Sequence, residues 1–153
     1  MAHTIRPYAD TDLDAVMAAW ESASLVGHPF LSETFKDTER YNIPNVYLPN
    51  TDTWVCVCDG EVVGFIAMIV GDGPTEVGAI FVQSSSHGTG VGRLLMDKAR
   101  DLYGQLELEV FTENALGRRF YEAYGFVPVS ERFHEDAGHM MLRLRYPAGP
   151  GED

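Results

Sequence analysis

Residues 80–92 read I-F-V-Q-S-S-S-H-G-T-G-V-G, and residues 93–100 continue as R-L-L-M-D-K-A-R. A β-branched and aromatic run thus ends in a small, polar, glycine-rich loop, after which apolar residues recur with helical spacing. Glycine lets the backbone come close to a ligand, and the first N–H groups of a helix lie at the positive end of its dipole. This strand–loop–helix pattern therefore predicts an anion site, and with it a phosphorylated cofactor.

Two familiar phosphate-binding patterns do not fit this loop. The dinucleotide fingerprint requires a glycine three places after Gly90, where the chain has Arg93. The phosphate loop of nucleotide hydrolases requires Gly-Lys-Ser/Thr, which the sequence lacks. A nucleotide-dependent enzyme is therefore disfavoured, whereas a glycine turn with a purely structural role stays open on the loop alone.

The composition is that of an acidic globular protein. The 153 residues include 23 acidic and 11 basic side chains, a formal net charge of −12, and 45% of them are hydrophobic. This charge argues against nucleic acid, whose phosphates require a basic surface, and slightly favours amine-bearing partners. No apolar run approaches the ~20 residues of a membrane span, and the N-terminus lacks a signal-peptide layout. We expect a cytoplasmic protein that binds neither nucleic acid nor membrane.

The two cysteines, Cys56 and Cys58, stand two residues apart in an apolar run. In a strand they would share a face, and C-x-C is a poor disulfide and at most half of a metal site. We therefore expect reduced core thiols and no bound metal.

Hydrophobic periodicity and turn residues predict the element order β-α-α-β-β-β-α-β-α-β-β. The first helix is expected to begin at Thr11 as N-cap, with Asp14 three residues on. This order gives an α/β (α+β) fold, a mixed sheet of about six to seven strands flanked on both faces by about four helices. We expect one domain over residues 1–146 and a flexible tail at 147–153. Strands are expected at 4–8, 53–58, 62–70, 76–82, 106–111, 126–133 and 139–145.

A second motif lies downstream, where residues 106–126 read L-E-L-E-V-F-T-E-N-A-L-G-R-R-F-Y-E-A-Y-G-F. Together with H-G-T-G-V-G at 87–92, it resembles the GNAT family, the Gcn5-related N-acetyltransferases, which move an acyl group from acyl-coenzyme A to an amine. The family loop usually runs Gln/Arg-x-x-Gly-x-Gly/Ala, so His87 departs from it, as does Ser84 where proline is common. The expected element order is also that of a minimal GNAT domain, and the resemblance covers nearly the whole chain.

The resemblance implies where acetyl-coenzyme A would bind. Backbone groups at a splayed strand edge would hold the pantetheine arm as an added strand would, and an N–H near Val82 would stabilise the oxyanion. The glycine loop would cradle the pyrophosphate, and the ring of His87 could donate to it as well. The residues concerned are Phe81, Val82 and Gln83 on the strand, and His87, Gly88, Thr89, Gly90, Val91, Gly92 and Arg93 in the loop.

Tyr121 is the expected general acid. It lies seven residues after Asn114 in the expected helix, so both side chains can face the cofactor. A phenol with a pKa of about 10 stays protonated at neutral pH and can protonate the departing thiolate. The alternative is a core aromatic beside Phe120 and Tyr124. Asn114 is a natural helix N-cap that could also contact the cofactor.

The acceptor side is less sharply defined by the sequence. Glu109 alternates with its apolar neighbours in a strand and could face the cleft as general base. Glu21 could border the acceptor site, although for both carboxylates the solvated role is favoured over the catalytic one, and a water chain could serve as base. His28 and Phe30 belong to a segment that resembles a branch of small bacterial GNATs, some of which acylate protein lysines, and are expected at the substrate lip.

The resemblance, with these residues in place, implies an N-acetyltransferase that moves an acetyl group from acetyl-coenzyme A to a primary amine by direct attack. The acceptor is a protein lysine or a small amine, with a slight preference for lysine that comes from the resemblance. The alternative is a non-catalytic acyl-coenzyme A sensor on the same fold, against which Tyr121 argues. Either a monomer or a homodimer is compatible with the sequence.

Overall fold

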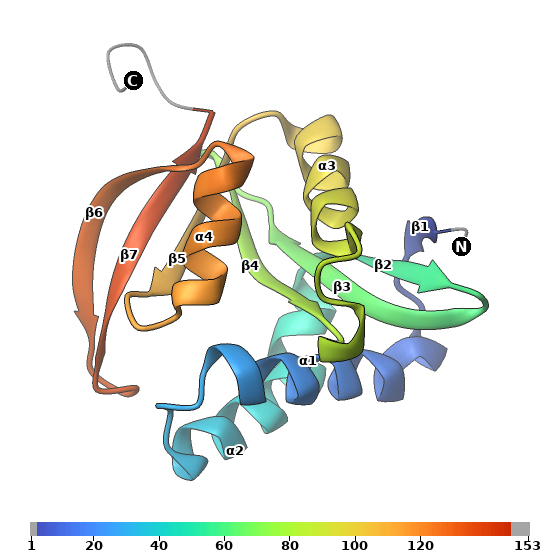
Figure 1. Cartoon of the computed structure of the whole chain (residues 1–153), viewed down its shortest axis with the longest axis horizontal. Helices are drawn as coiled ribbons and strands as arrows, with labels where there is room; N and C mark the ends of the chain where they lie inside the picture. The colour runs from blue at the N-terminus through green and yellow to red at the C-terminus, as the bar shows by residue number, and fades with distance from the viewer. Residues whose placement is uncertain (1–2, 148–153) are drawn as a thin grey trace.

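A seven-stranded mixed sheet with the strand order β1-β2-β3-β4-β5-β7-β6 forms the centre of the computed structural model, which describes residues 3–147 (Figure 1). Neighbouring strands are antiparallel except β4 and β5, which are parallel. The predicted mixed sheet is thus confirmed, while the expected tail lies, apart from Pro147, outside the described residues. The strands are β1 (His3–Pro7), β2 (Asp52–Cys58), β3 (Glu61–Ile69), β4 (Thr75–Val82), β5 (Leu106–Phe111), β6 (Val127–His134) and β7 (His139–Tyr146).

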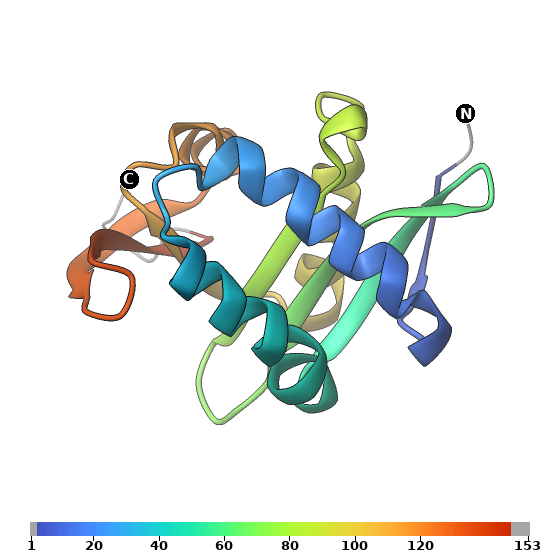
Figure 2. The ribbon, with the colours of Figure 1, turned by 90° about the horizontal axis from the view of Figure 1, so that it is seen from below.

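Helices cover both faces of this sheet (Figures 1 and 2). α1 (Leu13–Gly27) and α2 (Glu33–Asn42) lie on one face, and α3 (Val91–Tyr103) and α4 (Ala115–Tyr124) lie on the other. Two short helical turns at 43–47 and 48–50 follow α2, which the sequence did not predict. Within residues 3–147, no helix has the length and apolar character needed to cross a bilayer.

Side chains of the sheet alternate between two hydrophobic cores, as the pleat of a strand requires. Phe65 of β3 packs with Val16 and Trp20 of α1, whereas its neighbour Ile66 packs with Leu95 of α3. Both cysteines are buried and free. The two layers of helices are therefore fixed on opposite faces of the same strands, with the sheet as their common wall.

The first helix begins later than the sequence predicted. Thr11 lies inside a short 3-10 turn at Asp10–Asp12, and α1 starts at Leu13. The Asp12 carboxylate, 7% exposed, accepts a hydrogen bond from the Ala9 N–H at 2.9 Å and pairs with Arg6 at 2.8 Å. The expectation that Thr11 caps the helix is therefore wrong, because Asp12 uses a partner from β1 to fix the chain at this point.

Strands β4 and β5 diverge shortly after they begin. Their parallel pairing consists of Thr75 with Leu106 and Glu76 with Glu107, although β4 runs on to Val82 and β5 to Phe111. On its other side β4 remains paired with β3, where a register shift leaves Gly78 as an extra, bulged residue. The sheet therefore opens between β4 and β5, and each strand presents an unpaired backbone edge to the gap.

Candidate active site

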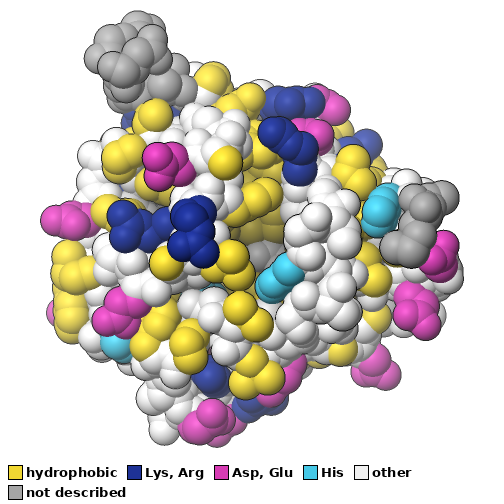
Figure 3. Space-filling view, viewed as in Figure 1, with side chains coloured by type: hydrophobic (Ala, Val, Ile, Leu, Met, Phe, Trp, Pro, Cys, Tyr) yellow, Lys and Arg dark blue, Asp and Glu magenta, His cyan; other side chains and the backbone are white. Residues whose placement is uncertain are grey.

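A cavity of about 710 Å³ passes through the gap between β4 and β5. Its walls include Trp20 and Lys36 from the α1/α2 face, Val91 and Tyr121 from the α3/α4 face, and both diverging strands. Figure 3 shows the α3/α4 face hollowed near its centre, with hydrophobic side chains on the walls. Because one cavity reaches both faces, two ligands entering from opposite sides can meet at the level of the sheet.

The glycine loop forms one wall of this cavity with unpaired backbone donors. Gly88 and Gly90 have φ of +79° and +91°, left-handed values that favour glycine. The first hydrogen bond of α3 runs from the Leu94 N–H to the Gly90 carbonyl at 3.0 Å. Within the described part of the chain, the N–H groups of Val91, Gly92 and Arg93 consequently have no acceptor. The wall is thus a helix N-terminus suited to an anion.

His87 uses its ring to hold the end of β4. Its Nε2 lies 2.8 Å from the carbonyl oxygen of Val82. Since a carbonyl can only accept, Nε2 carries the hydrogen of this bond. The Nε2 hydrogen of His87 is therefore used within the protein, to hold the end of β4, and is not free for a phosphate.

The inner edge of β4 presents backbone groups to the gap. The Gln83 N–H donates to the Val63 carbonyl at 2.7 Å and so faces β3. Alternation along an antiparallel ladder then directs the N–H groups of Ile80 and Val82 away from β3, toward the gap. Phe81 and Val82 line the cavity, but Gln83 and Thr89 do not.

Tyr121 of α4 borders the same cavity. Its ring packs edge-on against Phe120 at 5.5 Å and Phe126 at 5.8 Å, as a core aromatic does. Its hydroxyl makes no hydrogen bond within residues 3–147, and burial raises the pKa of the phenol above its ordinary value. The ring is therefore fixed by packing, while the hydroxyl stays protonated at neutral pH and available to a ligand.

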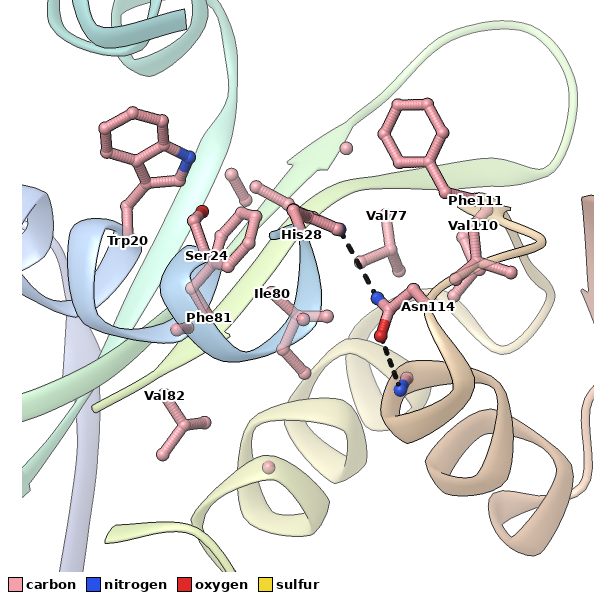
Figure 4. Close-up of a pocket in the computed structure, with 18 of the residues that line it drawn as sticks. Trp20, Ser24, His28, Val77, Ile80, Phe81, Val82, Val110, Phe111 and Asn114 are labelled. Carbon is pink, nitrogen blue, oxygen red and sulfur yellow. Dashed lines mark hydrogen bonds between the residues drawn. The ribbon is translucent and has the colours of Figure 1, made fainter. Parts of the chain in front are cut away.

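Asn114 links α4 to the end of α1 across the cavity. Its Oδ1 accepts from the Gly117 N–H at 2.9 Å, which confirms the predicted N-cap, and its Nδ2 lies 3.3 Å from His28 Nε2 (Figure 4). Because an amide nitrogen can only donate, His28 Nε2 holds a lone pair and Nδ1 carries the hydrogen. Burial, together with the nearby charge of Lys36, lowers the pKa of His28 to about 4, so its ring is neutral at pH 7.

The other candidates of the acceptor side have different surroundings. Glu109 borders the cavity but pairs with Arg132 through bonds of 2.6 and 2.7 Å, which lower the pKa of this carboxyl and make it a poor base. Glu21 pairs with Arg40 at 2.8 Å and does not line the cavity. Phe30 does not line it either, because its ring packs on Phe111 at 5.6 Å.

Sequence reasoning missed a carboxylate on α2. Glu39 lines the cavity, and it forms no ion pair with the described residues. Burial raises the pKa of Glu39, against the opposing effects of the Tyr47 hydroxyl and His134. The only sequence signal was the spacing of Lys36 and Glu39 on one helical face, which is weak in a helix that is polar nearly all round.

The fold and the site together define a class of protein. Residues 49–128 match the family model for the acetyltransferase (GNAT) domain. The chain therefore belongs to the GNAT family, and it is an acetyltransferase that uses acetyl-coenzyme A as donor. This confirms the fold, the enzyme class and the cofactor that the resemblance implied.

Among its relatives are bacterial acetyltransferases of similar length. The chain is 30% identical over 122 residues to the peptidyl-lysine N-acetyltransferase YiaC of Escherichia coli, covering 80% of this chain and 82% of YiaC. It is 28% identical over 150 residues to the peptidyl-lysine N-acetyltransferase YjaB of Salmonella typhimurium, covering 96% and 100%. The solution structure of apo YjaB from Escherichia coli is similar with a TM-score of 0.82 and 26% identity, covering 97% of this chain and all of that one.

Proposed function

We propose that this acetyltransferase modifies a lysine side chain by direct attack of the amine on the thioester. The observation that carries the proposal is that the unpaired amides of the α3 N-terminus and the Tyr121 hydroxyl border one cavity open to both faces of the sheet. The choice of lysine is supported by YiaC and YjaB, whose names state peptidyl-lysine acetylation.

The α3/α4 half of the cavity suits acetyl-coenzyme A. The N–H groups of Val91, Gly92 and Arg93 would take the pyrophosphate, and the edge of β4 at Ile80 and Val82 would hydrogen-bond the amides of the pantetheine arm. The bound cofactor supplies an activated acetyl group as a thioester. The Val82 N–H would stabilise negative charge that develops on the carbonyl oxygen.

Proton transfers are assigned to Glu39 and Tyr121. The acceptor arrives as an ammonium, and Glu39 takes one proton because its raised pKa makes it a better base than Glu109. As the N–C bond forms and the C–S bond breaks, Tyr121 gives its proton to the sulfur. The nitrogen then loses its second proton, which returns to the Tyr121 phenolate through water, and Glu39 releases its proton to solvent. The reduced state of Cys56 and Cys58 supports a cytoplasmic setting for this chemistry.

Two measurements separate this enzyme from a sensor on the same fold. Calorimetry would measure acetyl-coenzyme A binding, and a thiol assay would then follow release of coenzyme A with a blocked lysine peptide. We expect release that depends on the amine and yields the Nε-acetyl product by mass spectrometry. Tight binding without amine-dependent release would favour the sensor instead.

A further inference from the structure

Three hydrogen-bond donors without acceptors meet in the α1/α2 half of the cavity. Ser24 lies on α1, and His28 follows the last residue of this helix, where its backbone N–H donates to the Ser24 carbonyl at 2.9 Å. Lys36 approaches from α2. Figure 4 shows Ser24 on α1 and His28 near the end of this helix, both among the residues that line the cavity. All three line its wall, and Ser24 and Lys36 also border a small second cavity behind it.

Ser24 has a hydroxyl that is buried without a partner. The residue is 4% exposed, and its Oγ makes no hydrogen bond within the described residues. Buried hydroxyls are almost always paired, because leaving one unpaired costs free energy. An unpaired hydroxyl on the wall of a cavity therefore indicates a ligand atom as its missing partner.

Lys36 carries a positive charge in the same place. The residue is 9% exposed and forms no ion pair or side-chain hydrogen bond with residues 3–147. The ammonium of this largely buried side chain has no protein anion as partner among the described residues and borders the cavity, so it can bind an anion that enters there. The ligand atom that Ser24 lacks is thus expected to belong to an anion.

His28 completes the cluster as a neutral donor. The bond from Asn114 to Nε2 leaves the ring hydrogen on Nδ1, and no described residue accepts from it. Carboxylates line the same cavity: Glu39 lies one turn from Lys36 on α2, and Glu76 and Glu109 lie on the strands, while Glu21 and Glu33 border the second cavity. The cavity therefore places donors suited to an anion beside carboxylates suited to an amine.

We propose that the acceptor amine carries a carboxylate, which Ser24, His28 and Lys36 bind while the amine faces the thioester. The inference rests on the proposed function, since it describes the acceptor of the same reaction. The carboxylate has two possible sources, the free α-carboxylate of a small lysine-like substrate or an acidic side chain beside the target lysine of a peptide. Both present the same group to the same donors.

Matched acceptors test the proposal directly. Nα-acetyl-lysine and Nα-acetyl-lysine amide offer the same ε-amine with and without a carboxylate. Blocked Lys-Glu and Lys-Gln dipeptides make the same comparison for a side chain. We expect kcat/KM to favour the carboxylate by at least about tenfold in one pair, the loss expected when a charge-assisted contact is removed. The first pair would identify a free carboxylate, and the second an acidic neighbour.

Equal rates within both pairs would overturn the carboxylate proposal while leaving acetyl transfer intact. No transfer to any of the four acceptors would refute the proposed function, and this inference with it. Incubation with acetyl-coenzyme A alone gives an independent check by mass spectrometry. Acetylation of Lys36 would make it an acceptor and would exclude its role as an anion ligand.

The variant Lys36→Met links the preference to the donor cluster. It keeps the aliphatic stem and removes the charge, so the carboxylate-to-amide ratio of kcat/KM should fall to about 1. Lys98→Met is the matched control, because Lys98 lies over the Trp54 ring at 4.2 Å, outside the cavity, and should keep the wild-type ratio. Ser24→Ala should lower the ratio in the same direction if Lys36→Met does not fold. A wild-type ratio in a folded Lys36→Met would overturn the proposal.

Discussion

At Tyr121 the ring and the hydroxyl have separate roles, and one substitution separates them. Tyr121→Phe keeps the packing on Phe120 and Phe126 but removes the hydroxyl that we propose as proton donor. We expect kcat to fall by about 10²–10⁴-fold, the usual effect of losing a general acid. The Kd of acetyl-coenzyme A and the unfolding midpoint should change little. Steady-state kinetics and calorimetry would measure these effects.

Tyr124→Phe provides the control for Tyr121. Tyr124 lies one turn further along α4, and its hydroxyl donates to Asp97 at 2.6 Å rather than to a ligand. Loss of the hydrogen bond to Asp97 in Tyr124→Phe should lower the stability of the fold slightly and leave kcat unchanged. If Tyr121→Phe turned over at the wild-type rate, Tyr121 would be a core aromatic only.

At Glu39 the expected effect depends on pH. Its pKa is raised, and a base acts only when deprotonated, so kcat should rise with pH through a pKa above the ordinary value near 4.5. Glu39→Gln should lower kcat by about 100-fold and remove this acidic limb from the profile. Glu109→Gln should cost much less, because Arg132 already holds the Glu109 carboxylate. An unchanged profile in Glu39→Gln would assign the base to a water chain.

At the scale of a single element, the N-terminus of α3 can be tested by its glycines. An alanine at Gly90 would meet no atom within 4 Å, so the cost comes from its φ of +91° alone, about 1–2 kcal/mol. Relaxing this strain should turn the N–H groups of α3 and raise the Kd of acetyl-coenzyme A roughly tenfold. Calorimetry would measure the Kd and chemical denaturation the stability.

Gly104 gives the matched control at the other end of α3. Its φ is +77°, it has equal space for a Cβ, and it does not line the cavity. Gly104→Ala should therefore lose similar stability without a change in cofactor affinity. Equal effects of the two variants on affinity would mean that general destabilisation, not the anion site, is responsible.

The start of α1 depends on a carboxylate whose pKa is lowered, chiefly by its hydrogen bonds with Arg6. Such a group stabilises the fold above its unfolded pKa of about 3.9, and this contribution is lost as pH falls through the lower folded pKa. Asp12→Asn should therefore lower the free energy of unfolding by about 2 kcal/mol at pH 7. The difference in this free energy between variant and wild type should become smaller below about pH 4. Urea denaturation at several pH values measures it. A pH-independent difference would point to Ala9 rather than Arg6 as the important partner.

The helices and strands show which parts of the structure could be predicted from the sequence. The order of strands and helices was predictable because its signals are local, such as the Asp59-Gly60 turn and the glycine that ends α4. Thr11 was a wrong N-cap because the true anchor, Asp12, depends on Arg6 in another strand. Glu39 was missed for a related reason, since only packing decides which face of polar α2 lies against the sheet.

At the scale of the whole molecule, the divergence of β4 and β5 opens the site to both faces of the sheet. The gap joins the two faces of the sheet, with α3 and α4 on one side and α1 and α2 on the other. The bond between Asn114 and His28 then ties α4 to α1 across the cavity. The scaffold therefore fixes both halves of the site relative to each other, which is what direct transfer between two ligands requires.

The net charge of −12 acts on both substrates, with opposite signs. A cationic acceptor is attracted to an acidic protein and the anionic cofactor is repelled, and salt weakens both effects because the Debye length falls from about 30 Å at 0.01 M to about 8 Å at 0.15 M. Raising salt over this range should therefore increase KM for a lysine-rich cationic peptide a few-fold and lower KM for acetyl-coenzyme A. An acceptor of zero net charge, such as Nα-acetyl-lysine, serves as the control and should show little dependence. If both acceptors responded alike, the salt would be acting on the fold or on local contacts, and the long-range field would have no part in substrate capture.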